Sequence, residues 1–170
     1  MKSKKRSKIT SGKLSPPDDS PVFFLDRTFG RNELAAILRP AGFTVVTIFE
    51  EFGEAEAKIA DPVFILDCGF KDRVVLTGDQ DMVFTYAKEI AEAGIAVFVT
   101  TNNNEGPDKW GPRIITAKAA IIRELNRRQK PFTASISKEG QITLVRVYDG
   151  AEWKTIPIRR RNPSNYERKK

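Results

Sequence analysis

The sequence predicts an α/β fold built on a parallel sheet, and two observations lead to this class. Four short runs of apolar, largely β-branched or aromatic residues lie at 21–26, 43–49, 73–77 and 95–101. Helical patterns separate these runs, and strands that are buried on both faces read as near-continuous apolar runs. We therefore expect a central parallel sheet with helices on both faces, followed by a C-terminal β-hairpin.

Each element follows from its local pattern. The strand "PVFFLD" ends abruptly in Asp26, and "GRNELAAILRPAGF" is a helix stopped by Pro40 and Gly42. "FTVVTIF" is rich in β-branched residues and predicts a second strand. Asp61 before Pro62 predicts the N-cap of a short helix over about 62–68. The chain thus alternates strand and helix in its first half.

The second half continues the alternation. "RVVLT" is the third strand, 79–94 an amphipathic helix closed by Gly94, and "IAVFVTT" the fourth strand. A helix over 112–129 and a hairpin over 132–147, with its turn at Glu139-Gly140, complete the pattern. The hairpin either completes the sheet or pairs its exposed edge with another chain, for example in a homodimer.

Basic residues are concentrated at the two ends of the chain. The net charge is +7, but residues 21–150 hold 16 Lys or Arg and 18 Asp or Glu. We expect a disordered basic tail over 1–20, one domain of ordinary length over 21–150 and a basic tail over 151–170. Such tails favour a polyanionic partner without identifying it.

Composition excludes several kinds of site. The chain has no histidine, which excludes histidine bases and His-containing zinc sites, and its single Cys68 cannot form an intramolecular disulfide. No signal peptide or run of about 18 apolar residues is present, so we expect a soluble cytoplasmic protein with no membrane partner. The remaining chemistry must use carboxylates, hydroxyls, amides or basic groups.

Three aspartates are expected near one edge of the sheet. Asp26 follows the first strand, Asp79 follows the third, and Asp61 precedes a helix. Each also has a structural explanation, because Asp61 and Asp79 can cap helices and Asp26 can pair with Arg27 or Arg73. Gathered together, however, the carboxylates repel one another unless a cation lies among them. An all-oxygen site favours Mg²⁺ or Mn²⁺, and carboxylate-bound metal ions promote phosphodiester hydrolysis.

The order "FFLD", a helix, "FTVV" and "DPVFILDCGFKDRVVLTGDQDM" resembles the PIN-like nucleases, in particular a compact group related to the VapC toxins of type II toxin-antitoxin pairs. The resemblance covers about residues 22–101. It implies an Mg²⁺- or Mn²⁺-dependent endoribonuclease that cuts RNA and is silenced by a cognate antitoxin protein. It also implies metal ligation by Asp26, Asp61 and Asp79, with Asp81 as an outer catalytic carboxylate and Thr77 as a supporting residue.

Two features depart from the family pattern. Arg27 stands where many relatives carry an acid or an amide, so it either lowers the metal affinity or grips a phosphate. Larger relatives place a Glu on a helix before Asp61, and here four candidates stay open: Glu50, Glu51, Glu54 and Glu56.

The loop after the fourth strand supplies candidate RNA contacts. Asn102 and Trp110 are expected to contact RNA, because an aromatic ring stacks on an unpaired base, and Lys109 and Arg113 are expected to bind phosphates. The alternative is a plain polar connection. A second function also stays open, a catalytically degenerate PIN-like module that binds RNA without cutting it.

Overall fold

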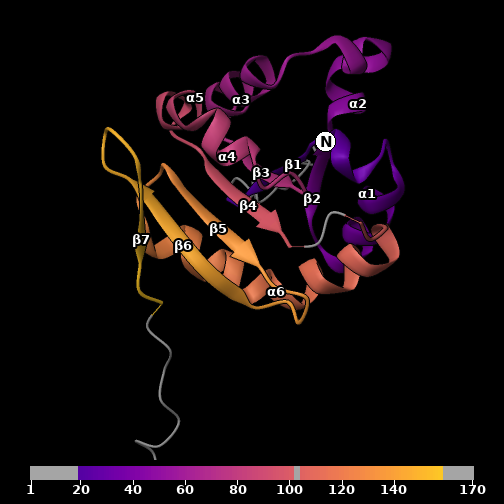
Figure 1. The fold of residues 1–170 in the computed structure, drawn as a ribbon. Coiled ribbons are helices and arrows are strands. Elements are labelled where there is room, and N and C mark those ends of the chain that lie inside the picture. Colours follow the sequence, from indigo (N-terminus) through magenta and orange to yellow (C-terminus); the bar gives the residue numbers. More distant parts are fainter. Residues whose placement is uncertain (1–18, 102–103, 159–170) are drawn as a thin grey trace, which may run out of the picture.

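A seven-stranded mixed sheet forms the centre of the molecule (Figure 1). The computed structural model describes residues 19–101 and 104–158. The strand order is β2-β1-β3-β4-β5-β6-β7, with parallel pairing from β2 to β5 and antiparallel pairing of β5 with β6 and of β6 with β7. The strands are β1 (Val22–Leu25), β2 (Thr44–Thr47), β3 (Val74–Thr77), β4 (Ala96–Thr100), β5 (Phe132–Ile136), β6 (Ile142–Tyr148) and β7 (Trp153–Ile156).

Helices connect the parallel strands and cover both faces of the sheet. The α-helices are α1 (Glu33–Leu38), α2 (Ile48–Phe52), α3 (Asp61–Phe70), α4 (Met82–Thr85), α5 (Ala87–Ala93) and α6 (Pro107–Arg127). Short 3₁₀ segments are η1 (Arg27–Phe29), η2 (Arg39–Ala41) and η3 (Gly53–Lys58). The α/β class is as the sequence predicts, although the sheet is parallel only in part.

Alternation along the strands creates two hydrophobic cores. Phe23 and Leu25 of β1 face a core with α1 and α6, whereas Phe24 between them faces a core with α3, α4 and α5. Because successive side chains of a strand point to opposite faces, a strand that is apolar at every position can serve both cores. This explains why the parallel strands lack the polar alternation of a half-exposed strand.

Several boundaries differ from those predicted. β5 pairs with β4 as a fifth parallel strand, and β7 extends the sheet into the expected tail that began at 151. The helix expected over 112–129 begins at Pro107, and the helix expected over 79–94 is divided into α4 and α5 at Tyr86, whose φ of −113° and ψ of 33° are not helical. The expected tail over 1–20 lies almost wholly outside the described residues.

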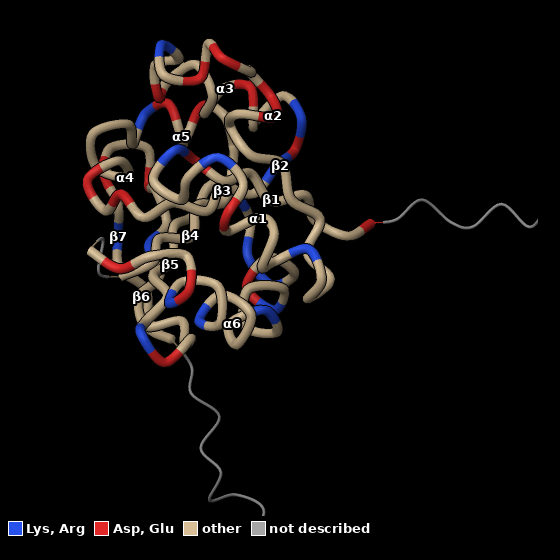
Figure 2. Tube along the Cα trace, turned by 90° about the vertical axis from the view of Figure 1, so that its right-hand side faces the viewer, with Lys and Arg blue, Asp and Glu red and all other residues tan. Residues whose placement is uncertain are grey.

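The surface of the described domain carries mixed charge. Figure 2 shows basic and acidic residues interleaved along the chain rather than collected in a patch of one sign. No helix within the described ranges is long and apolar enough to cross a membrane.

Candidate functional site

The strand order changes direction between β1 and β3. The chain passes from β1 to its neighbour β2 on one side, and then crosses to β3 and β4 on the other side. In open α/β sheets ligands bind beyond the carboxyl ends of the strands at such a point, because the loops there diverge. The residues that follow β1 and β3 are Asp26 and Gly78-Asp79, so the candidate site contains two of the predicted aspartates.

Asp26 is buried and tightly held. Its side chain is 3% exposed, and its backbone N–H continues the ladder by donating to Leu76 O at 3.3 Å. The Oδ1 atom accepts from the N–H of Thr28 at 3.0 Å and from the Thr28 hydroxyl, while Oδ2 accepts from the Thr77 hydroxyl. Three donors therefore fix one orientation of this carboxylate at the end of β1.

Burial gives Asp26 an unusual pKa. Desolvation raises the pKa of this carboxyl from 3.8 to about 6, against the lowering effect of the hydrogen bonds from Thr28 and Thr77. The charge of Asp79 raises it further. No basic side chain forms an ion pair with Asp26 among the described residues, which excludes the salt bridge to Arg27 or Arg73 considered from the sequence. A buried acid without a cationic partner is a characteristic of functional sites.

Thr28 is a site residue that the sequence analysis missed. Besides donating to Asp26, its Oγ1 accepts from the Gly78 N–H at 2.9 Å, so it links the loop after β1 to the loop after β3. A Cβ at position 78 would lie 3.2 Å from that oxygen, a tight contact. The available signal was the Asp-x-Thr spacing, since an Asp side chain commonly accepts from the N–H two residues on.

Asp79 combines a structural contact with a half-buried position at the site. Its Oδ1 accepts from the backbone N–H groups of Asp81 at 2.9 Å and Met82 at 3.3 Å, and its own N–H donates to Thr77 Oγ1 at 2.9 Å. Asp79 thus bonds to N–H groups at the start of α4, but the N-cap is Asp81 and not Asp79, the residue considered from the sequence. Asp81 occupies the position before α4 and is exposed. The Thr77 hydroxyl connects Asp26 and Asp79 directly.

Asp61 is engaged by Arg27. The Arg27 Nη2 lies 3.4 Å from Asp61 Oδ1 and also donates to the carbonyl of Ile59. The prediction that Asp61 caps its helix is wrong, because Ala60 is the N-cap and Asp61 is already the first residue of α3, with Pro62 second. There the carboxylate lies near the positive end of the helix dipole, which accounts for an acid at this position.

The four candidate glutamates all pair with basic side chains. Glu50 pairs with Arg39 and completes a capping box with Thr47, whereas Glu51 pairs with Lys71 and Arg73. Hydrogen bonds from Lys71 and Arg73 hold the pKa of Glu51 below its usual value. Arg31 forms ion pairs with both Glu54 and Glu56. These ion pairs account for the glutamates structurally.

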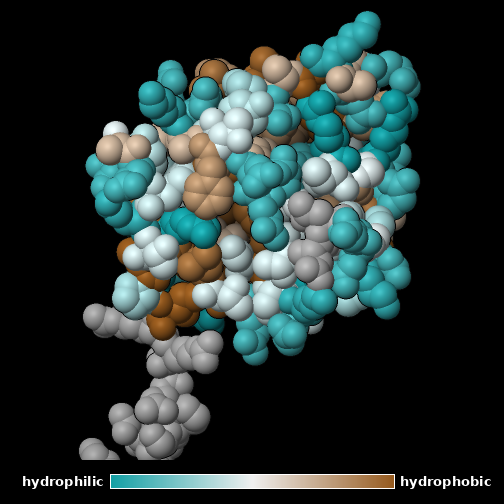
Figure 3. Space-filling view, in the orientation of Figure 1, coloured by the Kyte–Doolittle hydropathy of each residue, from teal (hydrophilic) through white to brown (hydrophobic). Residues whose placement is uncertain are grey.

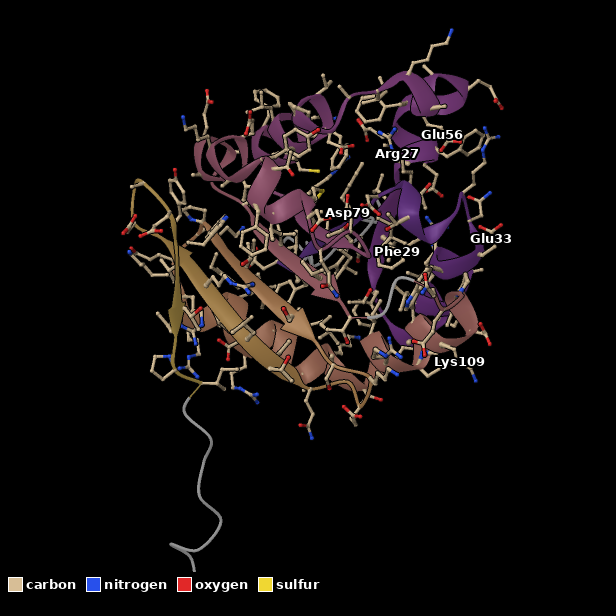
Figure 4. The ribbon with its side chains drawn as sticks, in the orientation of Figure 1. Arg27, Phe29, Glu33, Glu56, Asp79 and Lys109 are labelled. Atoms are coloured by element: carbon tan, nitrogen blue, oxygen red, sulfur yellow. The ribbon has the colours of Figure 1, made fainter. Side chains whose placement is uncertain are left out.

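Two of the predicted RNA contacts are corrected by the structure. Trp110 is 5% exposed and packs edge-on against Phe29 at 5.0 Å between ring centroids, so its ring has no open face for a base. Arg113 is 6% exposed and donates to Thr101 O at 2.9 Å and to Glu105 at 2.6 Å, which occupies its guanidinium. Lys109 is exposed on α6, apart from Arg27 and Asp79 in Figure 4. Asn102 lies outside the described residues.

The donor set fits a hydrated Mg²⁺ or Mn²⁺ only in part. No group of three or more His, Cys, Asp or Glu side chains in the described ranges is placed to hold a metal ion. Asp26 and Asp79 nevertheless interact through their charges, and Oδ1 of each carries the backbone hydrogen bonds. Mg²⁺ commonly binds through one or two carboxylates, several waters and a substrate phosphate. Asp26 and Asp79 therefore stay predicted ligands of such an ion, while Asp61 is paired with Arg27.

Comparisons of this chain with protein-family models, with curated proteins and with solved structures found no match.

Proposed function

We propose that this protein is a PIN-like endoribonuclease that hydrolyses RNA with a carboxylate-bound Mg²⁺ or Mn²⁺. The observation that supports it best is Asp26, a buried carboxylate held by Thr28 and Thr77, electrostatically coupled to Asp79 at the switch point of a parallel sheet. A polypeptide gains no stability from burying a carboxyl without a cationic partner. A cation that binds during function accounts for the arrangement.

The proposed roles follow from the contacts. Asp26 and Asp79 would hold the ion, with Asp81 in an outer position, and a bound Mg²⁺ supplies charge neutralisation at the phosphate and acidifies water. Thr28 and Thr77 keep Asp26 in one orientation, so no conformational entropy is lost there when substrate binds. Arg27, whose side chain is 38% exposed, can exchange Asp61 for a phosphate oxygen.

RNA as the substrate is part of this proposal. The basic residues of the two chain ends supply attraction to a polyanion, and the resemblance to the compact PIN-like group favours RNA over DNA. Within the same proposal the protein acts in the cytoplasm as the toxin of a type II pair and is silenced by an antitoxin. The basic chain ends would also be complementary in charge to an acidic segment of that antitoxin.

The test is cleavage of a mixed-sequence single-stranded RNA with Mg²⁺, with Mn²⁺ and with EDTA. We expect cleavage only with a divalent ion, and its loss by at least about 100-fold in Asp26→Asn and Asp79→Asn. Asp72→Asn is the matched control, because Asp72 is exposed before β3 at the opposite end of the sheet and forms an ion pair with Lys130 there. Equal cleavage by Asp79→Asn and Asp72→Asn, or cleavage in EDTA, would overturn the proposal.

The second candidate function is an RNA-binding module without catalysis, and the Arg27–Asp61 ion pair favours it. If Arg27 permanently neutralises Asp61, one predicted ligand is lost. Calorimetric titration with Mn²⁺ separates the two functions. Uptake of Mn²⁺ by the wild-type protein that tightens in Arg27→Ala, as Asp61 is released, supports the enzyme. RNA binding without any Mn²⁺ uptake supports the module.

A further inference from the structure

A small cavity lies between α4, which follows Asp79 in the chain, and the strands β5 and β6. Its volume is about 240 Å³. One wall is α4 with Phe84 and the preceding Gln80, and the other is formed by β5 and β6 with Ser135 and Arg146. Gln80, which lines the cavity, directly follows Asp79 in the sequence. Figure 3 shows apolar surface beside α4 and over the neighbouring strands, flanked by hydrophilic residues.

The sheet topology explains why this face is open. Phe132, Ala134 and Val145 of β5 and β6 point into the core with α6. Their neighbours Ser135, Leu144 and Arg146 therefore point to the opposite face, where α3 and α5 pack over β1, β3 and β4. The short helix α4 lies over β5 and β6 here, and a hollow remains between the helix and these strands.

The cavity is lined by an aromatic ring that has a cation over one of its faces. Phe84 is 56% exposed, although most large apolar residues of the described domain are buried. The guanidinium carbon of Arg146 lies 5.0 Å from the centroid of the Phe84 ring. Hydroxyl groups of Ser135 and Thr143 and the amide of Gln80 provide hydrogen-bonding groups at the rim.

α4 is held in place by the last strand. The indole N–H of Trp153 in β7 donates to the carbonyl of Val83 at 2.6 Å, one residue before Phe84. Trp153 itself packs edge-on against Tyr148 of β6 at 5.2 Å between ring centroids. The two walls of the cavity are thereby connected, so Phe84 is presented on a braced element rather than on a loose turn.

We propose that this cavity binds an unpaired nucleobase of the RNA next to the scissile phosphate. Base stacking on an aromatic ring or on an arginine plane is the usual way in which proteins hold single-stranded RNA. A volume of 240 Å³ suits one planar ring system rather than a larger ligand. The inference rests on the proposed function, because it takes RNA as the substrate, and it assigns to Phe84 the stacking role that buried Trp110 cannot fill.

The test measures binding without cleavage. Fluorescein-labelled single-stranded RNA homopolymers of A, C, G and U are titrated with the full chain in EDTA, and fluorescence anisotropy gives each Kd. Stacking energies of single bases predict a Kd that rises roughly 5- to 100-fold in Phe84→Ala for at least one homopolymer. Phe84→Trp should retain binding. Phe70→Ala is the matched control, since Phe70 is 91% exposed at the other end of the sheet.

An abasic ribose-phosphate oligomer separates base stacking from charge attraction. We expect wild type and Phe84→Ala to bind it equally, because it has the same charge and no bases. Kd values of Phe84→Ala within twofold of wild type on all four homopolymers would overturn the cavity proposal. It would also be overturned if Phe84→Ala weakened binding to the abasic oligomer as much as binding to the homopolymers. These measurements need no metal. If the binding pattern is as expected but no Mg²⁺-dependent cleavage is found, the nuclease proposal is refuted and the cavity proposal stands.

Discussion

At the scale of single residues, Asp26 carries a free-energy cost that depends on pH. Its pKa is about 6 in the folded state and 3.8 as the ordinary value. Between these values the folded state binds the proton and the unfolded state does not, so stability falls as pH rises. The cost is fully present above pH 6 and is absent below about pH 3.8. The difference of about two pKa units corresponds to about 3 kcal/mol.

Asp26→Asn should remove this dependence. In EDTA, the free energy of unfolding of the wild type relative to Asp26→Asn should fall by about 2 kcal/mol between pH 4.5 and 7.5, because only the wild type carries the ionising group. Urea unfolding at the two pH values measures both proteins, and the other titrating groups cancel in the difference. Parallel pH dependence of wild type and variant would show that Asp26 has an ordinary pKa.

The sequence indicated single site residues when a strong local pattern was present. Asp26 and Asp79 could be placed because each directly follows an apolar strand, and parallel strands end at one edge. Trp110 was misplaced because a loop was assumed where α6 had already begun, and Arg113 because it lies on the buried face of that helix. Whether an arginine meets a phosphate or a carbonyl depends on tertiary contacts that residue type does not encode.

At the scale of elements, α3 and α5 pack unusually closely at Gly69. A Cβ at this position would lie 2.5 Å from the carbonyl oxygen of Ala93 and 2.8 Å from its Cα. Because the neighbour is backbone, it cannot move aside as a flexible side chain would. Gly69 therefore sets the distance between two helices that cover the same face of the sheet.

Gly69→Ala should destabilise the protein. Overpacking costs about 1–3 kcal/mol, which exceeds the gain of up to about 1 kcal/mol from the better helix propensity of alanine. Urea unfolding at 25 °C gives the change in free energy. Val63→Ala on the exposed side of α3 is the control, and it should change stability by no more than about 0.5 kcal/mol. A Gly69→Ala protein as stable as the wild type would mean that the helices can separate without cost.

Element boundaries were harder to predict than element existence. Proline is favoured in the first turn of a helix, so both Pro107 and Pro112 could mark the start of α6. The helix begins at Pro107 and contains Pro112 in its interior. The division at Tyr86 has no sequence signal, since 79–94 keeps a helical pattern of apolar residues throughout. Here tertiary contacts, of α4 with β7 and of α5 with α3, outweigh the local helix propensity.

At the scale of the whole molecule, the strand order could not be read from the sequence. Apolar strands indicate burial on both faces, but they do not specify which strands become neighbours, because backbone pairing is the same for all of them. The strand β7 was missed because its residues lie in a segment whose composition is basic. It also lacks a two-residue alternation, because Trp153 and Ile156 at its ends pack against opposite cores while Lys154 and Thr155 between them are exposed.

The remaining basic end gives a prediction for the complete chain. Residues 159–170 contain six Lys or Arg and one Glu, and a chain that ends at 158 keeps β7. If these cations contact RNA phosphates, removing them should reduce the slope of log K against log salt concentration by up to about 4, following about 0.7 counterions released per contact on a single strand.

Anisotropy titrations of an RNA homopolymer in EDTA at several salt concentrations measure this slope. Phe84→Ala provides the contrast, because stacking releases few counterions: it should weaken binding at every salt concentration and leave the slope unchanged. Removal of 159–170 should do the reverse, with the largest loss at low salt and convergence on the wild type at high salt. An unchanged slope in the shortened chain would place the RNA contacts within residues 1–158 and leave the charge of 159–170 for another acidic partner.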